Sequence, residues 1–363
     1  MNILIDIGHP AHVHYYRNLA TDLTGNGHKV IWTIKEIAVV RRLLDHYGFI
    51  YFVFPRKADS MIGKVFKQLS YDWKLWQRCR KEKIDIALGT SGTVTHVSKL
   101  SRVKSVMFDD DDDDVQPLVT KYVSPFADSL LSPDVLKGKR KRKDTLFFPG
   151  YMELAYLHPK RFTPDPSVLK DAAVKEGEPF FIMRFNVFKA HHDVGIKGLS
   201  LKQKLKLIDI LKPYGKIFIT TERNIEPELK QYQMSVSPEK AHSLMAYAKL
   251  FIGDSQTMTS EAAMLGVPSL RCNSFAGRIS YLEEQEKRYR LTFAYLPDKF
   301  DQLIIKLNEM LSMPDLNEEW QRRRQQMLKD KIDVTAFMLW FIENYPLSTQ
   351  KISESISFWE QFK

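Results

Sequence analysis

The chain has 363 residues, of which 44% are apolar and 12% aromatic, so it can build two hydrophobic cores and is not intrinsically disordered. A net charge of +10 favours an anionic partner, and nucleotide sugars, lipid pyrophosphates, an anionic membrane and nucleic acid all qualify. The two cysteines, Cys79 and Cys272, have the spacing of neither a disulfide framework nor a metal site. No apolar run approaches the roughly 20 residues of a membrane-spanning helix, and the first residues lack a signal-peptide pattern. We therefore expect a cytoplasmic protein.

The chain begins with a predicted strand, helix and strand. Residues 2–8 form an apolar strand that ends in a glycine, residues 12–24 have helical spacing, and residues 29–34 form the second strand. This βαβ order predicts a parallel sheet in an α/β fold.

Three histidines, His9, His12 and His14, stand where the first turn of such a fold often has glycines. A neutral imidazole at the amino end of a helix can act as a general base, because the helix dipole lowers its pKa. The same histidines could instead cap the helix and pack at a domain interface. Zinc binding is a third interpretation, but no Cys, Asp or Glu stands at the usual spacing, so we expect no metal and no cofactor.

The first half continues as alternating helices and strands and ends with a strand at Leu130 and Leu131. Trp73 and Trp76 lie on one side of a long amphipathic helix, where we expect them to be buried in the core. The other predicted elements are a helix ending over residues 41–47, strands at 51–54, 84–88 and 105–108, and the amphipathic helix at 64–83.

Two loops of this half carry candidate site residues. Gly89, Thr90 and Ser91 lie between a strand and a helix, and we expect them on the same side of the sheet as His12, where they bind an acceptor or give two domains room to close. Six consecutive aspartates, residues 109–114, follow the next strand. A carboxylate at a strand end can orient an acceptor hydroxyl or hold a cation. We expect Asp109 to be that group and most of the others to be solvated.

A basic loop and a short motif lead out of the first half. Residues 137–143 contain six basic side chains, which we expect to be a solvated loop rather than a docking patch. The sequence Gly150-Tyr151-Met152-Glu153 follows. Glu153 is an acceptor-side candidate, either for the chemistry or as a residue that ties the hinge.

The second half restarts with an apolar strand at residues 180–184, followed by another at 216–221. Arg184 stands at the carboxyl end of the first of these strands. Its guanidinium matches two phosphate oxygens, so Arg184 is a candidate phosphate ligand, the alternative being an ordinary interdomain ion pair. His191 and His192, a few residues further on, are weaker candidates for assisting a leaving group.

Residues 237–273 have the order helix, strand, loop, helix, strand, and the loop between the strand and the second helix is a candidate phosphate site. Free N–H groups and the helix dipole bind anions at such a place. Glu261, one helical turn further, can accept hydrogen bonds from the two hydroxyls of a ribose. Alternatively, Glu261 is an acid of the first turn and Ser255 a plain cap. The loop residues are Asp254, Ser255, Gln256 and Thr257.

This stretch resembles the donor half-site of GT-B glycosyltransferases, in particular the enzyme that adds N-acetylglucosamine to the lipid-linked peptidoglycan precursor, and of non-hydrolysing UDP-N-acetylglucosamine 2-epimerases. Those families have an aliphatic strand, a loop and helix of the type D/R-S-G-x-x-x-x-E, and a G-x-P turn. Here Gln256 stands where a glycine is common, and the turn is Gly266-Val267-Pro268. Together with DIGHPAHVH and GYMELAYLHP, the chain most closely resembles an uncharacterised bacterial and archaeal family of predicted GT-B glycosyltransferases.

The resemblance implies two Rossmann-like domains, each a parallel sheet flanked by helices, that face each other across a cleft. We expect an acceptor domain at residues 1–160, a nucleotide-sugar domain at 161–345, and a last helix at 346–363 that returns to the first domain. The peptidoglycan enzyme ends its first loop in Gly-Gly-His, and His12 matches that imidazole, so His12 ranks before His9 and His14. Arg271 and Arg278 are candidates for contacts with the base or sugar.

The predicted reaction is transfer of a sugar from a nucleotide-diphospho-sugar, with UDP favoured, to a hydroxyl of a saccharide or lipid-linked saccharide. Surface-polysaccharide synthesis is the expected pathway, with at most a peripheral contact to the inner face of the membrane. Epimerisation of the nucleotide sugar is the first alternative. A non-catalytic protein that binds a nucleotide or polyanion is the second, although the sequence has no nucleic-acid-binding motif.

Overall fold

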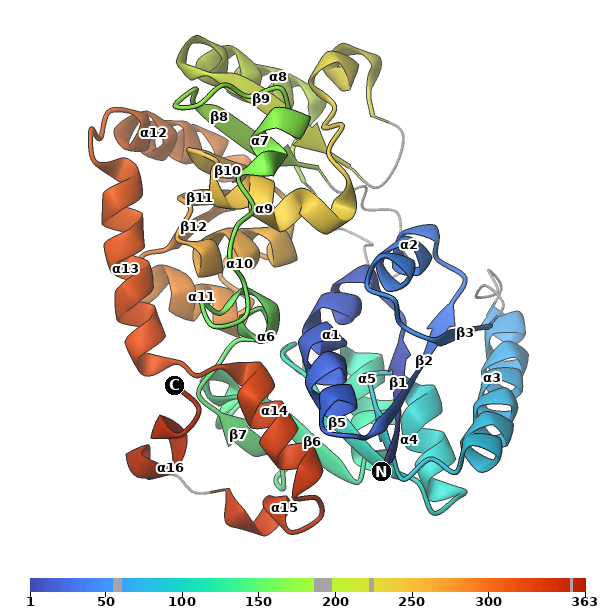
Figure 1. Cartoon of the computed structure of the whole chain (residues 1–363). Helices are drawn as coiled ribbons and strands as arrows, with labels where there is room; N and C mark the ends of the chain where they lie inside the picture. The colour runs from blue at the N-terminus through green and yellow to red at the C-terminus, as the bar shows by residue number, and fades with distance from the viewer. Residues whose placement is uncertain (55–60, 186–197, 222–224, 353–354) are drawn as a thin grey trace. The chain divides into compact units, whose positions relative to one another are not determined.

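The computed structural model describes residues 1–54, 61–185, 198–221, 225–352 and 355–363, with only the backbone of residues 61–67. The chain forms two compact units, each of them a parallel sheet covered by helices (Figure 1). The first unit contains Met1–Arg161 and Lys331–Lys363, and the second contains Phe162–Asp330.

The sheet of the first unit has the strand order β3-β2-β1-β4-β5-β6-β7, and every described pairing in it is parallel. The chain runs outward from β1 to β3 and then returns to β4 on the other side of β1. The order therefore reverses between β1 and β4, and this is the point where open α/β sheets bind ligands. The strands are β1 (Asn2–Ile7), β2 (Lys29–Lys35), β3 (Tyr51–Phe54), β4 (Ile86–Leu88), β5 (Lys104–Phe108), β6 (Ser129–Pro133) and β7 (Leu146–Phe148).

Helices cover both faces of this sheet because alternate residues of each strand point to opposite sides. Leu4 of β1 and Ala87 of β4 pack in one core with residues of the third and fourth helices, and Phe108 of β5 contacts Phe148 and Phe341 in another. The helices of this unit are α1 (Pro10–Gly25), α2 (Ala38–His46), α3 (Met61–Glu82), α4 (Gly92–Lys99), α5 (Pro117–Tyr122), α6 (Leu154–Leu157), α14 (Val334–Glu343), α15 (Ser348–Lys351) and α16 (Ile356–Glu360).

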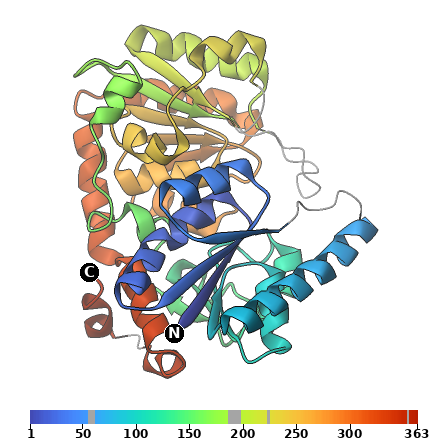
Figure 2. The same cartoon turned by 45° about the vertical axis from the view of Figure 1, so that its right-hand side comes forward.

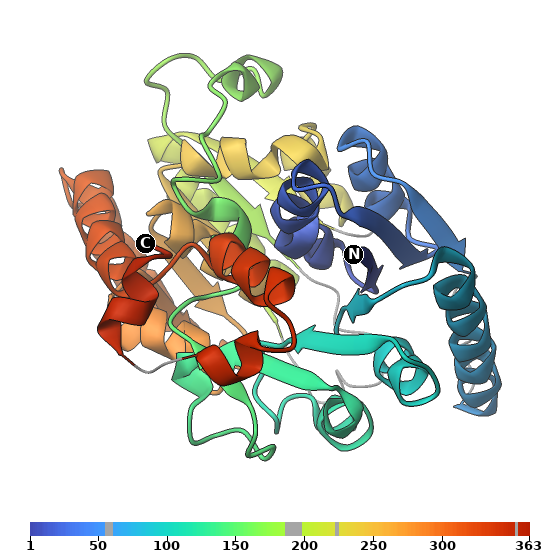
Figure 3. The same ribbon diagram turned by 60° about the horizontal axis from the view of Figure 1, so that its bottom comes forward.

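The carboxyl-terminal segment differs in part from the expected domain division. Residues 331–345 belong to the first unit, although the sequence placed them in the second. The apolar side chains of α14 explain this, since Phe337 contacts Phe148 of β7 with ring centroids 5.4 Å apart. Trp359 and Phe362 pack in turn on Phe337, at 5.3 and 5.6 Å, so residues 346–363 also belong to the first unit (Figure 3).

The expectation that both tryptophans of α3 are buried is wrong for Trp73. Tyr71, Leu75 and Cys79, spaced four residues apart, are the residues of this helix that reach the core. Trp73 follows Tyr71 by two residues, or about 200° around the helix, and so points away from the sheet. It is 58% exposed, while Trp76 is partly buried against the core. Figure 2 shows α3 along the outside of the unit.

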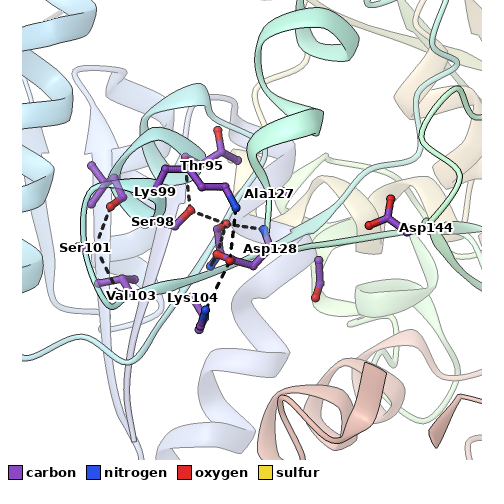
Figure 4. A network of polar contacts seen from close by, with 12 residues as sticks. Thr95, Ser98, Lys99, Ser101, Val103, Lys104, Ala127, Asp128 and Asp144 are labelled. Carbon is purple, nitrogen blue, oxygen red and sulfur yellow. Dashed lines mark hydrogen bonds and ion pairs between the residues drawn. The ribbon is translucent and has the colours of Figure 1, made fainter. Parts of the chain in front are cut away.

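A polar network ties α4 to the amino ends of β5 and β6 (Figure 4). The backbone N–H and hydroxyl of Ser105 donate to Asp128, at 2.9 and 3.0 Å, and Lys99 and Lys104 lie 3.6 and 3.7 Å from the same carboxylate. Burial alone would raise the pKa of Asp128, but these hydrogen bonds and cations lower it overall. The network lies at the edge opposite the switch point, so we assign it to the stability of the sheet.

The second unit has the strand order β12-β11-β10-β8-β9, again with parallel pairings. Here the order reverses between β8 and β10, which defines a second switch point. Its strands are β8 (Phe180–Arg184), β9 (Lys216–Thr220), β10 (Leu250–Gly253), β11 (Ser269–Cys272) and β12 (Thr292–Tyr295). The sequence did not predict β7 or β12, because runs of three and four residues are too short for a period of two to stand out.

The helices of the second unit begin and end at residues suited to these positions. The hydroxyl of Ser255 accepts from the Met258 N–H at the start of the tenth helix, and Gly266 ends that helix with a φ of 69°. The helices are α7 (Ser167–Asp171), α8 (Leu201–Leu211), α9 (Ala241–Ala246), α10 (Gln256–Leu265), α11 (Ser280–Lys287), α12 (Phe300–Leu311) and α13 (Leu316–Asp330). Short 3₁₀ helices of the two units cover Ser124–Phe126, Asp134–Leu136, Lys212–Tyr214, Pro227–Tyr232, Pro238–Lys240 and Pro297–Lys299.

Candidate functional site

At the first switch point, Asp6 joins the loops that follow β1 and β4. Its buried carboxylate accepts hydrogen bonds from the hydroxyls of Thr33, at 2.7 Å, and Ser91. Gly89 has a φ of 140°, and a Cβ there would lie 2.3 Å from the carbonyl oxygen of Asp6, so only glycine fits. Burial raises the pKa of Asp6, and Lys35, Ser91 and Thr33 offset part of that rise. The predicted acceptor loop, Gly89, Thr90 and Ser91, is therefore held against β1.

The three histidines of the first loop have different surroundings. The ring of exposed His9 caps α1 by accepting the Ala11 N–H at 3.2 Å, which is the structural role that the sequence offered as an alternative to catalysis. His12 is partly buried in the first turn of α1, with ring centroids 5.9 Å from His9 and 5.7 Å from Tyr15. His14 is buried and stacks on Tyr156, at 5.4 Å.

The motif GYMELAYLHP packs against the helix that carries the histidines. Asn18 of α1 donates to the carbonyl oxygen of Ala155 at 2.8 Å, and Thr335 of α14 donates to the same oxygen at 2.6 Å. Together with the stacking of His14 on Tyr156, these bonds bring two motifs together that are separated by more than a hundred residues in the sequence. Glu153, in the same motif, is fully buried.

The prediction that most of the six aspartates are solvated is wrong. Three side chains are buried, two partly buried and one exposed: Asp109, Asp112 and Asp113; Asp110 and Asp111; and Asp114. Arg140 explains much of this burial. Its guanidinium lies 2.9 Å from a carboxylate oxygen of Asp109 and 2.8 Å from one of Asp113, and the arginine side chain is only 3% exposed.

Arg140 also corrects the expectation for the basic loop 137–143. Most of this loop is exposed, as expected, but Arg140 belongs to the interior. The aspartates follow β5 and the basic loop follows β6, and these strands are neighbours in the sheet. The two charged runs therefore neutralise each other in part.

The carboxylates nearest β5 form one electrostatic cluster with Glu153 and Tyr16. Burial raises the pKa of Asp110, and Glu153 and Asp109 raise it further. The pKa of Asp109 is also raised by burial, with Arg140 acting against the rise. The pKa of Tyr16 is raised by burial and by the charges of Asp110 and Asp109. Tyr16 lies one helical turn after His12, so His12 lies on the same face of α1 as a residue that meets this cluster.

Asp109, Asp110 and Asp111 are also placed to hold a cation. One carboxylate oxygen of each lies within 4.8 Å of those of the other two. Oxygen donors in this number suit Mg²⁺ or Ca²⁺ rather than zinc. Their raised pKa values favour protonation in the absence of a cation.

At the second switch point, the end of β10 lies against the end of β8. Gly253 pairs with Arg184, and the Asp254 N–H donates to the carbonyl oxygen of Arg184 at 3.1 Å. A Cβ on Gly253 would lie 2.2 Å from that oxygen, so this close approach requires glycine. The partly exposed guanidinium of Arg184 donates to the hydroxyl of Thr220 at 3.1 Å. The structure therefore brings Arg184 and the start of α10 together, as the sequence predicted.

The loop before α10 has buried and exposed parts. Asp254 and Ser255 are buried, and the hydroxyl of Ser255 caps the helix. Gln256 and Thr257 are partly exposed in the first turn. N–H groups of the first turn have no acceptor within a helix, and the dipole adds positive potential there. Asn273, from the end of β11, fixes the loop by donating to the carbonyl oxygen of Asp254 at 2.7 Å.

Glu261 is held by a residue that the sequence did not single out. It lies in the second turn of α10, not in the first, which removes the first-turn alternative. Its side chain is buried, and one carboxylate oxygen lies 2.9 Å from Nε2 of buried His242 on α9. A histidine in a short amphipathic helix gives no sequence signal for this role, because its partner is 19 residues away.

Two further arginines of this edge differ in exposure. Arg271 of β11 is 1% exposed and donates to Asn273 at 3.1 Å, and its Nε and Nη2 have no hydrogen-bond partner among the described residues. Burial lowers its pKa. Arg278 is exposed and lies over the ring of Phe275 at 5.6 Å. His191 and His192, the weaker leaving-group candidates, lie outside the described residues.

Sequence comparison places the chain in a family. Residues 1–292 match the model of the family described as "Protein of unknown function (DUF354)", and the chain belongs to that family. A curated relative, "Uncharacterized protein MJ0665" of Methanocaldococcus jannaschii, is 22% identical over 309 residues, which are 79% of this chain and 86% of the relative.

Solved structures with the same fold are nucleotide-sugar proteins. MnaA of S. aureus, solved with UDP, has a TM-score of 0.67 at 12% identity and covers 98% of this chain and 99% of its own. UDP-GlcNAc 2-epimerase of Neisseria meningitidis, bound to UDP-GlcNAc, has a TM-score of 0.61 at 12% identity, with 88% and 94% covered. The glycosyltransferase VinC, in complex with dTDP, has a TM-score of 0.60 at 11% identity, with 97% and 100% covered. The fold is therefore GT-B-like, with two Rossmann-like units, as the sequence predicted.

Proposed function

We propose that this protein is a glycosyltransferase that moves a sugar from a nucleotide-diphospho-sugar, with UDP-sugars favoured, to the hydroxyl of a saccharide or lipid-linked saccharide in surface-polysaccharide synthesis. The observation that carries this proposal is the second switch point, where Arg184 lies beside the start of α10 and Glu261 follows one turn later. A guanidinium and first-turn N–H groups suit a diphosphate, and a carboxylate suits a ribose. The complexes of MnaA with UDP and of VinC with dTDP support a donor of this class.

Each unit would contribute one part of the reaction. His12 would remove the proton from the acceptor hydroxyl as its oxygen bonds to the anomeric carbon. The bond between that carbon and the diphosphate oxygen breaks, and Arg184 and the first-turn N–H groups of α10 would stabilise the charge on the departing diphosphate. His9, as the cap of α1, would fix the start of the helix that carries His12. Asp109 would orient the acceptor, with Gly89, Thr90, Ser91 and Glu153 near it.

Epimerisation of the nucleotide sugar is the second candidate, supported by a specific observation. Epimerisation at a sugar carbon needs an acid and a base on the substrate, and the cluster of Asp109, Asp110 and Glu153 contains carboxyl groups with raised pKa values. The likeness to UDP-GlcNAc 2-epimerase supports it as well. The two candidates differ in product, because only transfer to an acceptor releases a nucleoside diphosphate.

A thermal-shift screen tests the donor site shared by both candidates. The protein is heated with UDP, GDP, CDP, dTDP and their sugars, and a nucleotide at 100 times its dissociation constant should add about 2.7 kcal/mol of stability. We expect the largest shift with UDP or a UDP-sugar. In Glu261→Ala, we expect the dissociation constant to rise about tenfold, because a charged hydrogen-bond acceptor for the ribose is lost.

Glu318→Ala is the matched control, since Glu318 is an exposed glutamate on α13 of the same unit. It should bind as the wild type does. If no nucleotide shifts the transition, the donor site is wrong and a non-catalytic polyanion-binding protein becomes the better hypothesis. If Glu261→Ala binds with unchanged affinity, the ribose assignment alone is wrong.

A further inference from the structure

The outer surface of α3 has an unusual composition. We define it as the exposed residues of the described part of this helix: Leu69, Ser70, Trp73, Lys74, Gln77, Arg80 and Lys81. Leu69 is 61% and Trp73 58% exposed, and both are among the larger apolar side chains of the described residues that face solvent. They lie four residues apart, so they form one stripe along the helix.

Aromatic and cationic groups continue this stripe. Trp73 stacks on Trp76 with ring centroids 5.0 Å apart and an angle of 22° between the planes. The guanidinium of Arg80 lies over the ring of Trp76, 4.8 Å from its centroid. The outer surface of α3 therefore presents a leucine and two stacked indoles next to a column of cations, with Lys74 and Lys81 at its sides.

The two carboxylates of the helix are kept off this surface. Asp72 accepts from Gln68 at 2.7 Å and lies 3.1 Å from Nδ1 of His96 on α4. Glu82 pairs with Lys29 at 2.9 Å and with Arg78 at 3.1 Å. Within residues 68–82, the exposed side chains thus include three cations and no anion.

We infer that the outer surface of α3 binds an anionic membrane surface. Tryptophan and leucine enter the boundary between headgroups and acyl chains, while lysine and arginine pair with anionic headgroups, and this surface offers both in one stripe. Among the described residues no helix is long and apolar enough to cross a bilayer, so the contact is peripheral. It does not depend on the proposed catalytic function.

A second copy of this chain fits the surface less well. A two-fold dimer would bring the same patch of both copies together, and Lys74, Arg80 and Lys81 would meet their own counterparts without a carboxylate between them. Nucleic acid would use the cations and the indoles, but it offers nothing for the exposed leucine. An anionic bilayer uses all of these groups.

Co-sedimentation with lipid vesicles tests this inference. The full chain is mixed with phosphatidylcholine vesicles and with vesicles containing about one third phosphatidylglycerol, an anionic lipid. We expect binding to the anionic vesicles that weakens as salt rises. Lys74→Gln with Arg80→Gln and Lys81→Gln should reduce the partition coefficient about a hundredfold at low salt, and Leu69→Ser with Trp73→Ser about tenfold.

The basic loop supplies a control of matched charge. Lys137→Gln with Lys139→Gln and Lys143→Gln removes the same number of cations from exposed positions in the densest basic segment of the chain. This variant should lose much less binding than the α3 triple variant. Circular dichroism should give the same fold for all variants, because substitutions at exposed positions change stability little.

Three results would overturn the inference. The first is a wild-type protein that does not bind anionic vesicles, including the case in which it binds single-stranded RNA instead. The second is an unchanged partition coefficient after Leu69→Ser with Trp73→Ser. The third is an equal loss from the two triple variants, which would mean attraction by net charge rather than by this surface.

Discussion

The two switch points have the same topology and opposite chemistry. Between β1 and β4, the first edge gathers carboxylates that are buried together, and Asp109 and Asp110 have raised pKa values. Between β8 and β10, the second edge sets Arg184 beside the start of α10, and its buried Glu261 is joined to His242. The first edge suits proton transfer and the second suits an anion. A repeated fold thus acquires two different tasks from its loops rather than from its sheets.

The largest expected effect comes from breaking the chemistry of the first edge without touching the second. His12→Gln should lower the turnover number by about 10² to 10⁴, because a general base is lost, while the dissociation constant of the donor stays unchanged. The measurement is release of nucleoside diphosphate from the donor that the thermal-shift screen identifies, together with donor binding by the same method.

His46→Gln, which changes an exposed histidine of α2, should have no effect on either quantity. A His12→Gln enzyme with full activity would remove His12 as the base. An unfolded His12→Gln protein would also count against the assignment, because it would give the residue a structural role.

The next effect tests what keeps the first edge together. Arg140→Met should lower the free energy of unfolding by about 3 to 5 kcal/mol at neutral pH, since it leaves Asp109 and Asp113 buried without their cation. Urea unfolding measures this. The loss should shrink as pH falls, because protonation neutralises the two carboxylates.

The surface pairs of the second unit provide the control. Arg322 pairs with Asp315 at 3.2 Å and with Glu319 at 2.9 Å, and it is largely exposed. Arg322→Met should therefore cost less than about 1 kcal/mol. Equal losses in the two variants would mean that Arg140 makes no special contribution and that water screens the aspartates.

The sequence predicted most strands, both switch-point loops and the pairing of Arg184 with the start of α10, because each of these depends on local signals such as apolar runs, caps and small residues. It did not predict that Arg140 enters the aspartate run or that His242 holds Glu261, because those contacts join segments that are distant along the chain. Nor did it separate Trp73 from Trp76. Their spacing suits a common face, and only the packing of Tyr71 and Leu75 decides which side is buried.

The smallest effect asks whether raised carboxyl pKa values belong only to the first edge. In the second unit, burial raises the pKa of Glu286 to about 7, with the Ala294 N–H and Arg271 acting against the rise. A glutamate whose pKa is raised by folding stabilises the protein below its unfolded pKa, and that contribution is lost as pH rises toward 7. Glu286→Gln cannot ionise, so its stability relative to the wild type should grow by about 1 to 2 kcal/mol between pH 4.5 and pH 8.

Urea unfolding of both proteins across that range measures the difference. Glu309→Gln, at an exposed position of α12 in the same unit, should leave the difference from wild type flat with pH. A flat difference for Glu286→Gln as well would mean that water reaches this carboxylate, and the contrast between an acid-rich first edge and a cationic second edge would then become sharper. A rising difference would place one protonatable carboxyl group beside Arg271. In that case deprotonation near neutral pH would compensate the buried guanidinium, and the positive potential available to a diphosphate at the second edge would fall as pH rises.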